Sequence, residues 1–469
     1  MISTRWRLAV GAIVMAAVAS VASAQVTTGS VTGRVTDKNG NPLSGATVQV
    51  KSPSTGFVRG AQTNLEGRYM VAGIEPGADY TITARRIGFA ADTREMQTIS
   101  LGTTTKLDFT LSEQATQLTG VQIVATTDPV IAPSKTGVGT TITDSTLHRL
   151  PSLNRTFSDF VALTPQISNS GPGLSGGGAN NRYNNIQIDG STEKDLFGLG
   201  STGQPGGQAG GKSIGIEAVK QYQVLLSPYD VRYGNFSGAL INAVTKSGTN
   251  DLHGSALYNF EGSALESARR QTLRQTLTNS DVAEYISYPK DERKRNEPGF
   301  ALGGPIKKNR AWFFGAYQPA LTTIDRSVSP TTAVNPAAAS IATTQKLQTQ
   351  YITGNVTSQL NNSTRLRIAY NSSYAKTDGL LPALTGLDPA GTNYTKISEF
   401  PNYSASGNLD YVASSKLLFG IRGGYYMSDQ HDSNVTEQPL YRWTNTNNIG
   451  FLDVPASLQR GTRSEEHTS

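Results

Sequence analysis

The stretch NYSASGNLDYV at residues 402–412 decides the fold of this chain. Its side chains alternate between apolar and polar at every step. The apolar set is Tyr403, Ala405, Gly407, Leu409 and Tyr411, and the polar set is Asn402, Ser404, Ser406, Asn408 and Asp410. Successive residues of a β-strand point to opposite faces, so this period of two predicts a strand with one apolar and one polar face.

The same alternation occurs in neighbouring segments. Leu366, Ile368, Tyr370 and Tyr374 share one face, opposite Arg365, Arg367, Ala369, Asn371 and Ser373, and a third set is Leu417, Phe419, Ile421, Gly423 and Tyr425. Strand-like segments fall near 252–262, 297–303, 311–318, 350–360, 364–374, 402–412 and 417–427. Short turns at 304–310, 361–363 and 413–416 alternate with long stretches at 263–296, 319–349 and 375–401. An apolar outer face, a polar inner face and short-long connections are typical of a transmembrane β-barrel.

Composition supports a β-rich protein. The 469 residues carry 37% hydrophobic and 16% charged residues, with 48 glycines and 21 prolines, which suits short strands joined by polar turns. The formal net charge of +6 is small and dispersed, so nothing argues for nucleic acid as a partner. The chain has no cysteine, which excludes disulfides, thiol nucleophiles and thiolate metal sites.

The N-terminus predicts export. Arg5 and Arg7 precede an apolar run over 8–21, and Ala22-Ser23-Ala24 supplies the small residues that signal peptidase accepts. We therefore expect residues 1–24 to be a cleaved signal peptide; the alternative is a retained anchor, although the run is short for a membrane span. An exported chain without apolar helices can still enter a membrane as a closed barrel.

Residues 29–112 alternate β-branched residues with turn dipeptides. Four motifs follow in order, G-x-V-x-D, P-L-x-G-A-x-V, T-x-x-x-G-x-Y and a later Gly88-Phe89. The order resembles the carboxypeptidase regulatory-like domain, which implies a seven-stranded β-sandwich over residues 25–115. The four histidines (His148, His253, His431 and His467) have no second ligand at metal-binding spacing. We therefore expect an accessory module without metal rather than a peptidase.

Residues 119–250 carry a second ordered set of motifs. They include VQIVA at 121–125, LPSLNR at 150–155, NNRYNNIQIDG at 180–190, IEAVKQYQV at 216–224 and SGALINAVTKSGTN at 237–250. The set resembles the plug of TonB-dependent outer-membrane receptors, in the Oar-like branch that carries the regulatory-like sandwich in front. It implies an α+β plug over residues 116–250. The alternation of Asn185-Ile186-Gln187-Ile188 predicts a strand that buries only one face.

The resemblance implies a function and its residues. A ligand would bind at extracellular loops and plug apices, where we expect Arg182, Tyr183, Asn185 and Asp189 and the glycine-rich loops at 171–178 and 198–212 to contribute; Asp189-Gly190 could equally be only a tight turn. The TonB–ExbB–ExbD complex would supply energy through a TonB box. Val121, Gln122, Ile123, Val124 and Ala125 form the candidate box, or alternatively the first plug strand.

Two other motifs match enzyme signatures but lack the flanking structure that those signatures require. Residues 206–213, GGQAGGKS, match a phosphate-binding loop, but no buried strand precedes them. Residues 173–177, GLSGG, match a nucleophile elbow, but loop-forming residues flank them on both sides. We nominate no catalytic residue, metal or cofactor.

The barrel is expected to be partial. Only 219 residues follow residue 250, whereas receptors of this kind close with about 22 strands of about 10 residues each. Residues 303–314 resemble an early barrel hairpin, with Trp312 and Phe314 expected near a membrane interface. The last seven residues, 463–469 (RSEEHTS), are the translation of AGATCGGAAGAGCACACGTCT, the start of a sequencing-library adapter, so we expect a partial barrel over 251–462 and a non-native tail.

The sequence thus predicts a mainly β protein of the Gram-negative outer membrane. Its expected function is energy-dependent, TonB-coupled ligand uptake, with lipid around the barrel and an unknown extracellular ligand. The alternative is a non-transporting adhesin or assembly protein on the same scaffold.

Overall fold

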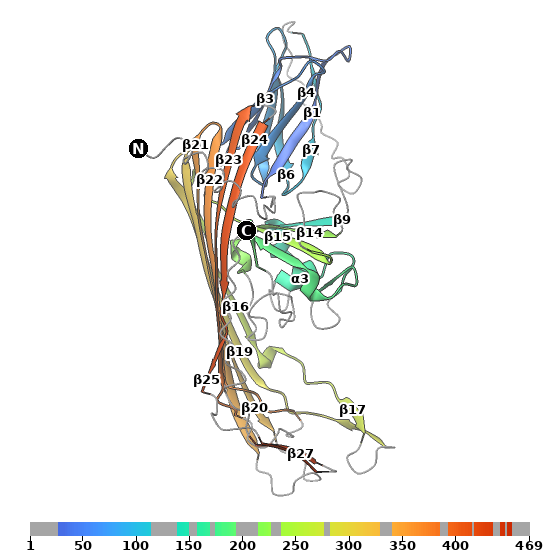
Figure 1. Ribbon diagram of the computed structural model, residues 1–469, viewed down its shortest axis with the longest axis vertical. Coiled ribbons are helices and arrows are strands. Elements are labelled where there is room, and N and C mark those ends of the chain that lie inside the picture. The colour runs from blue at the N-terminus through green and yellow to red at the C-terminus, as the bar shows by residue number, and fades with distance from the viewer. Residues whose placement is uncertain are drawn as a thin grey trace, which may run out of the picture.

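A computed structural model describes most of the chain. The described residues are 27–113, 138–149, 157–168, 174–193, 214–226, 236–275, 282–328, 340–384, 393–414, 417–434, 441–445 and 448–452. The expected signal peptide (1–24), the candidate TonB box (121–125) and the expected non-native tail (463–469) lie outside them. Within the described part, no helix is long and apolar enough to cross a membrane. Figure 1 shows a sandwich at one end, a plug beside it, and a tall sheet that runs past both.

The N-terminal sandwich consists of two four-stranded sheets. One contains β1 (Gly29–Asp37), β4 (Arg68–Ile74), β7 (Thr104–Lys106) and β8 (Phe109–Leu111), and the other contains β2 (Thr47–Lys51), β3 (Val58–Gln62), β5 (Gly77–Arg85) and β6 (Asp92–Ile99). Val31, Val48, Tyr69, Ile82 and Phe109 lie in the core between them. The predicted sandwich is therefore present, with eight strands instead of seven. The extra strand arises because β7 and β8 pair separately with β1, and between them the Asp108 carboxylate accepts a hydrogen bond from the Arg34 amide.

The plug is built on a five-stranded sheet of order β13-β12-β15-β14-β9. These strands are β9 (Val138–Thr143), β12 (Asn185–Ile188), β13 (Ser191–Thr192), β14 (Val219–Leu226) and β15 (Ala239–Thr245), and short elements surround them: α2 (Asp144–Arg149), α3 (Phe157–Val161), β10 (Ile167–Ser168), β11 (Ser175–Gly176), η2 (Asn181–Tyr183) and η4 (Ile216–Ala218). Ile186, Ile188, Ile241, Tyr222 and Phe160 pack in one apolar cluster. The α+β plug is thus confirmed.

The prediction that β12 buries only one face is wrong, because all four of its residues are buried. Its apolar side packs in the plug core, as expected. The polar side of the same sheet is covered by another domain: the Gln223 side chain on β14 donates a hydrogen bond of 2.7 Å to the carbonyl oxygen of Leu101 in the sandwich. A sequence pattern records only that two faces differ in polarity, and a polar face can still be buried against a polar partner.

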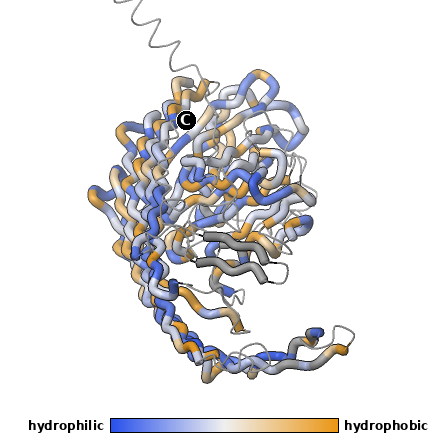
Figure 2. The backbone as a smooth tube through the Cα atoms, turned by 60° about the horizontal axis from the view of Figure 1, so that its bottom comes forward, coloured by the Kyte–Doolittle hydropathy of each residue, from blue (hydrophilic) through white to orange (hydrophobic). Residues whose placement is uncertain are grey.

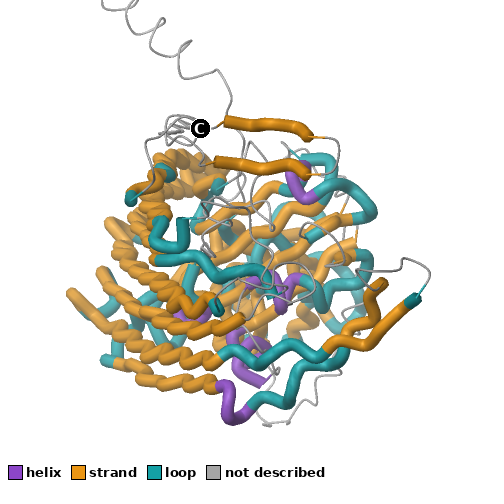
Figure 3. Tube along the Cα trace, turned by 90° about the horizontal axis from the view of Figure 1, so that it is seen from below, coloured by secondary structure: helices purple, strands orange, loops and turns teal. Residues whose placement is uncertain are grey.

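The barrel wall is an antiparallel sheet with neighbours in chain order. It contains β16 (His253–Gly262), β19 (Glu292–Lys307), β20 (Ala311–Val328), β21 (Ile341–Asn361), β22 (Thr364–Asp378), β23 (Ile397–Ser414) and β24 (Leu417–Ser428), and β25 (His431–Ser433) pairs with β23. Small hairpins are β17 (Thr272–Gln275) with β18 (Ala283–Ile286) and β26 (Tyr441–Asn445) with β27 (Asn448–Leu452); η5 is Ser263–Leu265. The described sheet curves around one side of the plug and does not close (Figure 3), as expected for an incomplete barrel.

All seven strand segments predicted from the sequence are present, and several are longer. For example, β20 continues ten residues beyond the expected 311–318 segment, to Val328. Its distal part contains Thr322, Thr323, Asp325 and Arg326, where polar residues on both faces remove the alternation that marks a strand. Figure 2 shows hydrophobic and hydrophilic residues alternating along parts of the curved sheet.

The side-chain directions agree with the predicted faces. On β22, Arg365, Arg367 and Ala369 are buried toward the plug, whereas Ile368 and Tyr370 are 55% and 44% exposed on the outside. One expectation needs correction: Trp312 and Phe314 are buried on the inner face, each only 3% exposed. Phe313 lies between them in the sequence, so Phe313 is the residue that faces outward. Phe314 packs in the plug core. Trp312 donates a hydrogen bond to the Asn250 side chain.

Candidate functional site

The four residues predicted to contact ligand separate into two groups. Arg182 and Tyr183 lie in η2 and are exposed, with the backbone amide of Arg182 bonded to the Asn180 side chain that caps the turn. Asn185 and Asp189 are each 1% exposed. The structure therefore places an exposed pair at the start of β12 and a buried carboxylate just past its end. Ligand contact stays a prediction for all four. Of the glycine-rich loops, only residues 174–178 are described.

Asp189 connects two strands of the plug. Its backbone has φ +48°, and Gly190 follows at φ +86°, which makes the tight turn from β12 to β13. The carboxylate accepts a hydrogen bond of 3.0 Å from the Thr245 amide and one of 2.6 Å from the Thr245 hydroxyl. Asp189 thereby fixes the end of β15, the neighbouring strand.

Asp189 also attaches the plug to the barrel wall. Nη2 of Arg367, on the inner face of β22, lies 3.1 Å from Asp189 Oδ1 and donates a hydrogen bond of 2.6 Å to the Thr245 hydroxyl. The side chains of Arg367 and Asp189 are 8% and 1% exposed. An ion pair this well buried is strongly orientation-dependent, because neither charge has water as an alternative partner.

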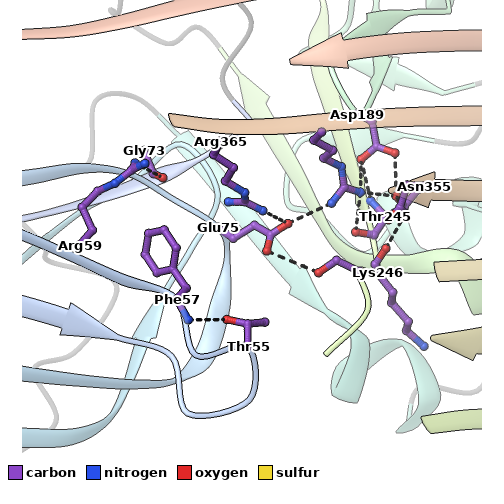
Figure 4. A network of polar contacts seen from close by, with 12 residues as sticks. Thr55, Phe57, Arg59, Gly73, Glu75, Asp189, Thr245, Lys246, Asn355 and Arg365 are labelled. Atoms are coloured by element: carbon purple, nitrogen blue, oxygen red, sulfur yellow. Dashed lines mark hydrogen bonds and ion pairs between the residues drawn. The ribbon is translucent and has the colours of Figure 1, made fainter. Parts of the chain in front are cut away.

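The same arginine reaches the sandwich. Its Nη1 lies 3.0 Å from the carboxylate of Glu75, which follows β4, and Arg365 forms a second ion pair with that carboxylate (Figure 4). Burial alone would raise the pKa of Glu75, but the nearby Arg365, Lys220 and Arg367 outweigh it and hold the pKa at about 2. We call Glu75, Asp189, Thr245, Arg365 and Arg367 the three-way junction, because they join sandwich, plug and wall.

Further polar contacts hold the plug to the inner face of the wall. Asn355 on β21 donates hydrogen bonds to the Thr245 hydroxyl (3.0 Å) and to the Lys246 carbonyl (2.7 Å). Asn408 on β23 donates to the Asp189 carbonyl at 3.1 Å. Ser404, also on β23, donates to the Glu193 carboxylate at 2.7 Å. Burial raises the pKa of Glu193, a plug residue, to about 8, opposed by the Ser404 hydrogen bond and reinforced by the charge of Asp189.

Sequence reasoning missed Glu75, Arg365 and Arg367 as site residues. The usable signal was the arginine pair on the predicted inner face of 364–374, since inward charges require a partner inside the barrel. The sequence did not show which acid is the partner, because Glu75 and Arg367 are 292 positions apart. No three histidine, aspartate or glutamate side chains gather as a metal site within the described ranges.

The orientation of the assembly follows from its connections. The short turns after β19 and β21 lie at the sandwich end of the wall, where Asn309 contacts Asn250 in the link between plug and wall. The strand ends that the longer connections join, such as the end of β20 and the start of β21, lie at the other end. In transmembrane barrels short turns are periplasmic and long loops extracellular, so the sandwich lies on the periplasmic side. A barrel wall with a plug on its concave face defines the architecture of an outer-membrane receptor.

Comparisons with known proteins agree with this architecture. Residues 30–112 match the carboxypeptidase regulatory-like domain, and residues 244–456 match a family described as outer membrane beta barrel domain. The TonB-dependent transporter Oar of Myxococcus xanthus is 26% identical over 322 residues, which cover 66% of this chain and 28% of the relative. The probable TonB-dependent siderophore receptor PirA of Acinetobacter baumannii is 26% identical over 183 residues, or 36% of this chain and 21% of the relative.

Among solved structures, the outer membrane transporter YddB of Escherichia coli is similar with a TM-score of 0.49 and 14% identity, covering 67% of this chain and 42% of that one. The chain spans about a quarter of the length of the curated relatives it matches. It is homologous to a TonB-dependent transporter and lies in the outer membrane of a Gram-negative bacterium. Both curated relatives are named as a transporter or receptor.

Proposed function

We propose that this chain belongs to a receptor that takes up a ligand across the outer membrane with energy delivered by the TonB–ExbB–ExbD complex. The observation that carries the proposal is the polar attachment of the plug through Asp189 and Arg367. Polar contacts exchange with water at small net cost. A plug held in this way can therefore leave and return to the wall, which suits transport, and the homology to a TonB-dependent transporter supports the same function.

The proposed mechanism needs no catalytic residue. A ligand binds on the extracellular side, where Arg182 and Tyr183 supply a cation and an aromatic ring from an exposed turn, and the loops at 171–178 and 198–212 complete the site. TonB pairs with residues 121–125 on the periplasmic side, and the pull loosens the plug from the wall. The chain acts as a receptor and transporter rather than as an enzyme.

Uptake by cells that express the complete protein tests this function. We expect energy-dependent accumulation of one member of a panel of iron chelates, glycans and peptides, abolished by a protonophore. Ile123→Pro removes a backbone donor needed for strand pairing and should reduce uptake at least tenfold, whereas Ile123→Val should not. Ligand binding without energy-dependent uptake would favour the adhesin or assembly alternative.

A binding measurement tests the ligand residues separately. Arg182→Ala, Tyr183→Ala and replacement of 198–212 by a short linker should each weaken ligand binding, because all three remove contacts from the extracellular site. Arg310→Ala, a substitution in a short turn at the sandwich end, is the matched control. Unchanged affinity in all three variants would remove these segments from the ligand site.

A further inference from the structure

The sandwich covers the periplasmic side of the plug. Gln223, on the polar face of the plug sheet, is 4% exposed and bonds to the Leu101 carbonyl of the sandwich. Ser247, just after β15, donates a hydrogen bond of 3.4 Å to Glu75. The plug sheet lies across the end of the sandwich in Figure 1. A plug that moves toward the periplasm therefore meets the sandwich.

The sandwich is also attached to the rim of the wall. The Asn250 amide donates to the Ser54 carbonyl at 2.8 Å. The Asn250 side chain accepts hydrogen bonds from the Asn309 amide (2.8 Å) and from Trp312 Nε1 (3.0 Å). One residue between plug and wall thus contacts the sandwich and the first short turn. Two of the contacts that dock the sandwich, one at Asn250 and one at Glu75, connect it to the wall and its rim.

At the second contact, one guanidinium serves both domains. Arg367 uses Nη1 for Glu75 of the sandwich and Nη2 for Asp189 and Thr245 of the plug. Glu75 therefore fixes the direction of the guanidinium fork, and with the sandwich docked the Arg367 side chain is only 8% exposed to solvent. Charge-assisted hydrogen bonds strengthen when water is excluded, so a docked sandwich strengthens the attachment of the plug to the wall.

We infer that the sandwich is a periplasmic lid over the plug and that Arg367 couples the two, so that undocking of the sandwich loosens the plug. The coupling follows from the shared guanidinium and does not require the proposed transport function. In a transporter it has a specific consequence. Residues 114–137 connect the lid to the plug, so a pull on the candidate TonB box at 121–125 acts on both.

The chain has no cysteine, so single introduced cysteines report the two movements separately. Ser191→Cys, the plug probe, places a thiol at a position that is 2% exposed and faces β24. Thr55→Cys, the lid probe, places a thiol in the small cavity between sandwich and wall, which is also lined by Glu75, Trp312 and Arg365. The rate of maleimide labelling in the complete, membrane-assembled protein then measures release of the plug and of the lid.

Glu75→Gln removes the charge on the lid that holds Arg367. We expect labelling of the lid probe and of the more distant plug probe to rise about tenfold together, and Arg365→Lys to give a smaller rise of both. Glu66→Gln, at an exposed acid of the same sandwich (71% side-chain exposure), should change neither rate. With Arg367→Lys, which cannot fork between two acids, Glu75→Gln should no longer affect labelling of the plug probe.

Each outcome decides the proposal. Faster labelling of the lid probe with unchanged labelling of the plug probe would show an uncoupled lid and overturn it. Unchanged rates at both sites would show that Glu75 does not hold the lid and would also overturn it. If Glu75→Gln fails to assemble, Arg365→Lys gives the same decision, because its contact is with Glu75 and it leaves Arg367 and Asp189 in place. A failure of ligand uptake alone would leave this result unaffected and concern only the proposed function.

Discussion

Arg367 and Asp189 are 178 positions apart in the sequence and form an ion pair of 3.1 Å between barrel wall and plug. Both side chains are buried, so the ion pair contributes more to the orientation of the plug against the wall than to the net free energy of folding. Because Thr245 bonds to both of them, the end of β15 is positioned by the wall. Asp189 and Arg367 form the one ion pair among the plug–wall contacts described above, so loss of this pair is directly measurable.

Asp189→Ala should weaken the attachment of the plug by about 3–5 kcal/mol, the usual effect of removing one partner of a buried ion pair. Amide hydrogen exchange over 239–245 should accelerate at least about 100-fold. Asp189→Asn keeps an oxygen for the Thr245 amide and should have a smaller effect. Asp251→Ala, at an exposed acid just before the wall, is the control. Equal exchange in all three variants would show that the plug does not depend on Asp189.

The fold could be predicted further than the site. In segments 402–412 and 364–374 apolar and polar residues alternate, because one face of the strand meets lipid and the other meets the plug. The wall strands and the direction of their side chains can therefore be predicted from local sequence. The extended end of β20 was missed because Thr322 and Thr323 are both polar. The three-way junction was missed for another reason. Its acids come from the sandwich and the plug and its arginines from the wall, and no local pattern records which distant charge is the partner.

Ile368→Arg should impair assembly into the outer membrane. Ile368 is 55% exposed on the outer face of β22, directly beside Val356 of β21. An arginine on the lipid face costs up to about 4 kcal/mol at the bilayer midplane and less toward the interfaces. We expect a lower fraction of heat-modifiable, folded protein in membranes, whereas Ile368→Val should assemble normally. Normal assembly of the arginine variant would contradict the assignment of this face to lipid.

Acid should undock the sandwich through Glu75. Its pKa is held at about 2, below the reference value of 4.5, so its contribution is fully present above pH 4.5 and is lost as the pH falls toward 2. The difference corresponds to roughly 3 kcal/mol at 1.36 kcal/mol per pH unit. Exchange of the Asn250 amide, which donates a hydrogen bond to the Ser54 carbonyl of the sandwich, should therefore accelerate over this window after correction for intrinsic rates. In Glu75→Gln the corrected exchange should be fast at every pH, and a wild-type corrected exchange that is flat between pH 5 and 2 would contradict the prediction.

Glu193 should make the plug less stable in alkali. Its pKa is raised to about 8 by burial, so the folded plug holds a proton that the unfolded chain releases near pH 4.5. Stability therefore falls as the pH rises from 4.5 to 8, by an upper limit of roughly 5 kcal/mol.

Glu193→Gln keeps an oxygen acceptor for the Ser404 hydroxyl without a titrating proton. Its exchange over 239–245 should slow relative to wild type at pH 8 and match it near pH 5, after correction for intrinsic rates. Glu95→Gln, on the exposed surface of the sandwich, should follow the wild type throughout. A wild-type protein whose corrected exchange does not change between pH 5 and 8 would show that Glu193 is charged, with water or a cation in place of the missing proton.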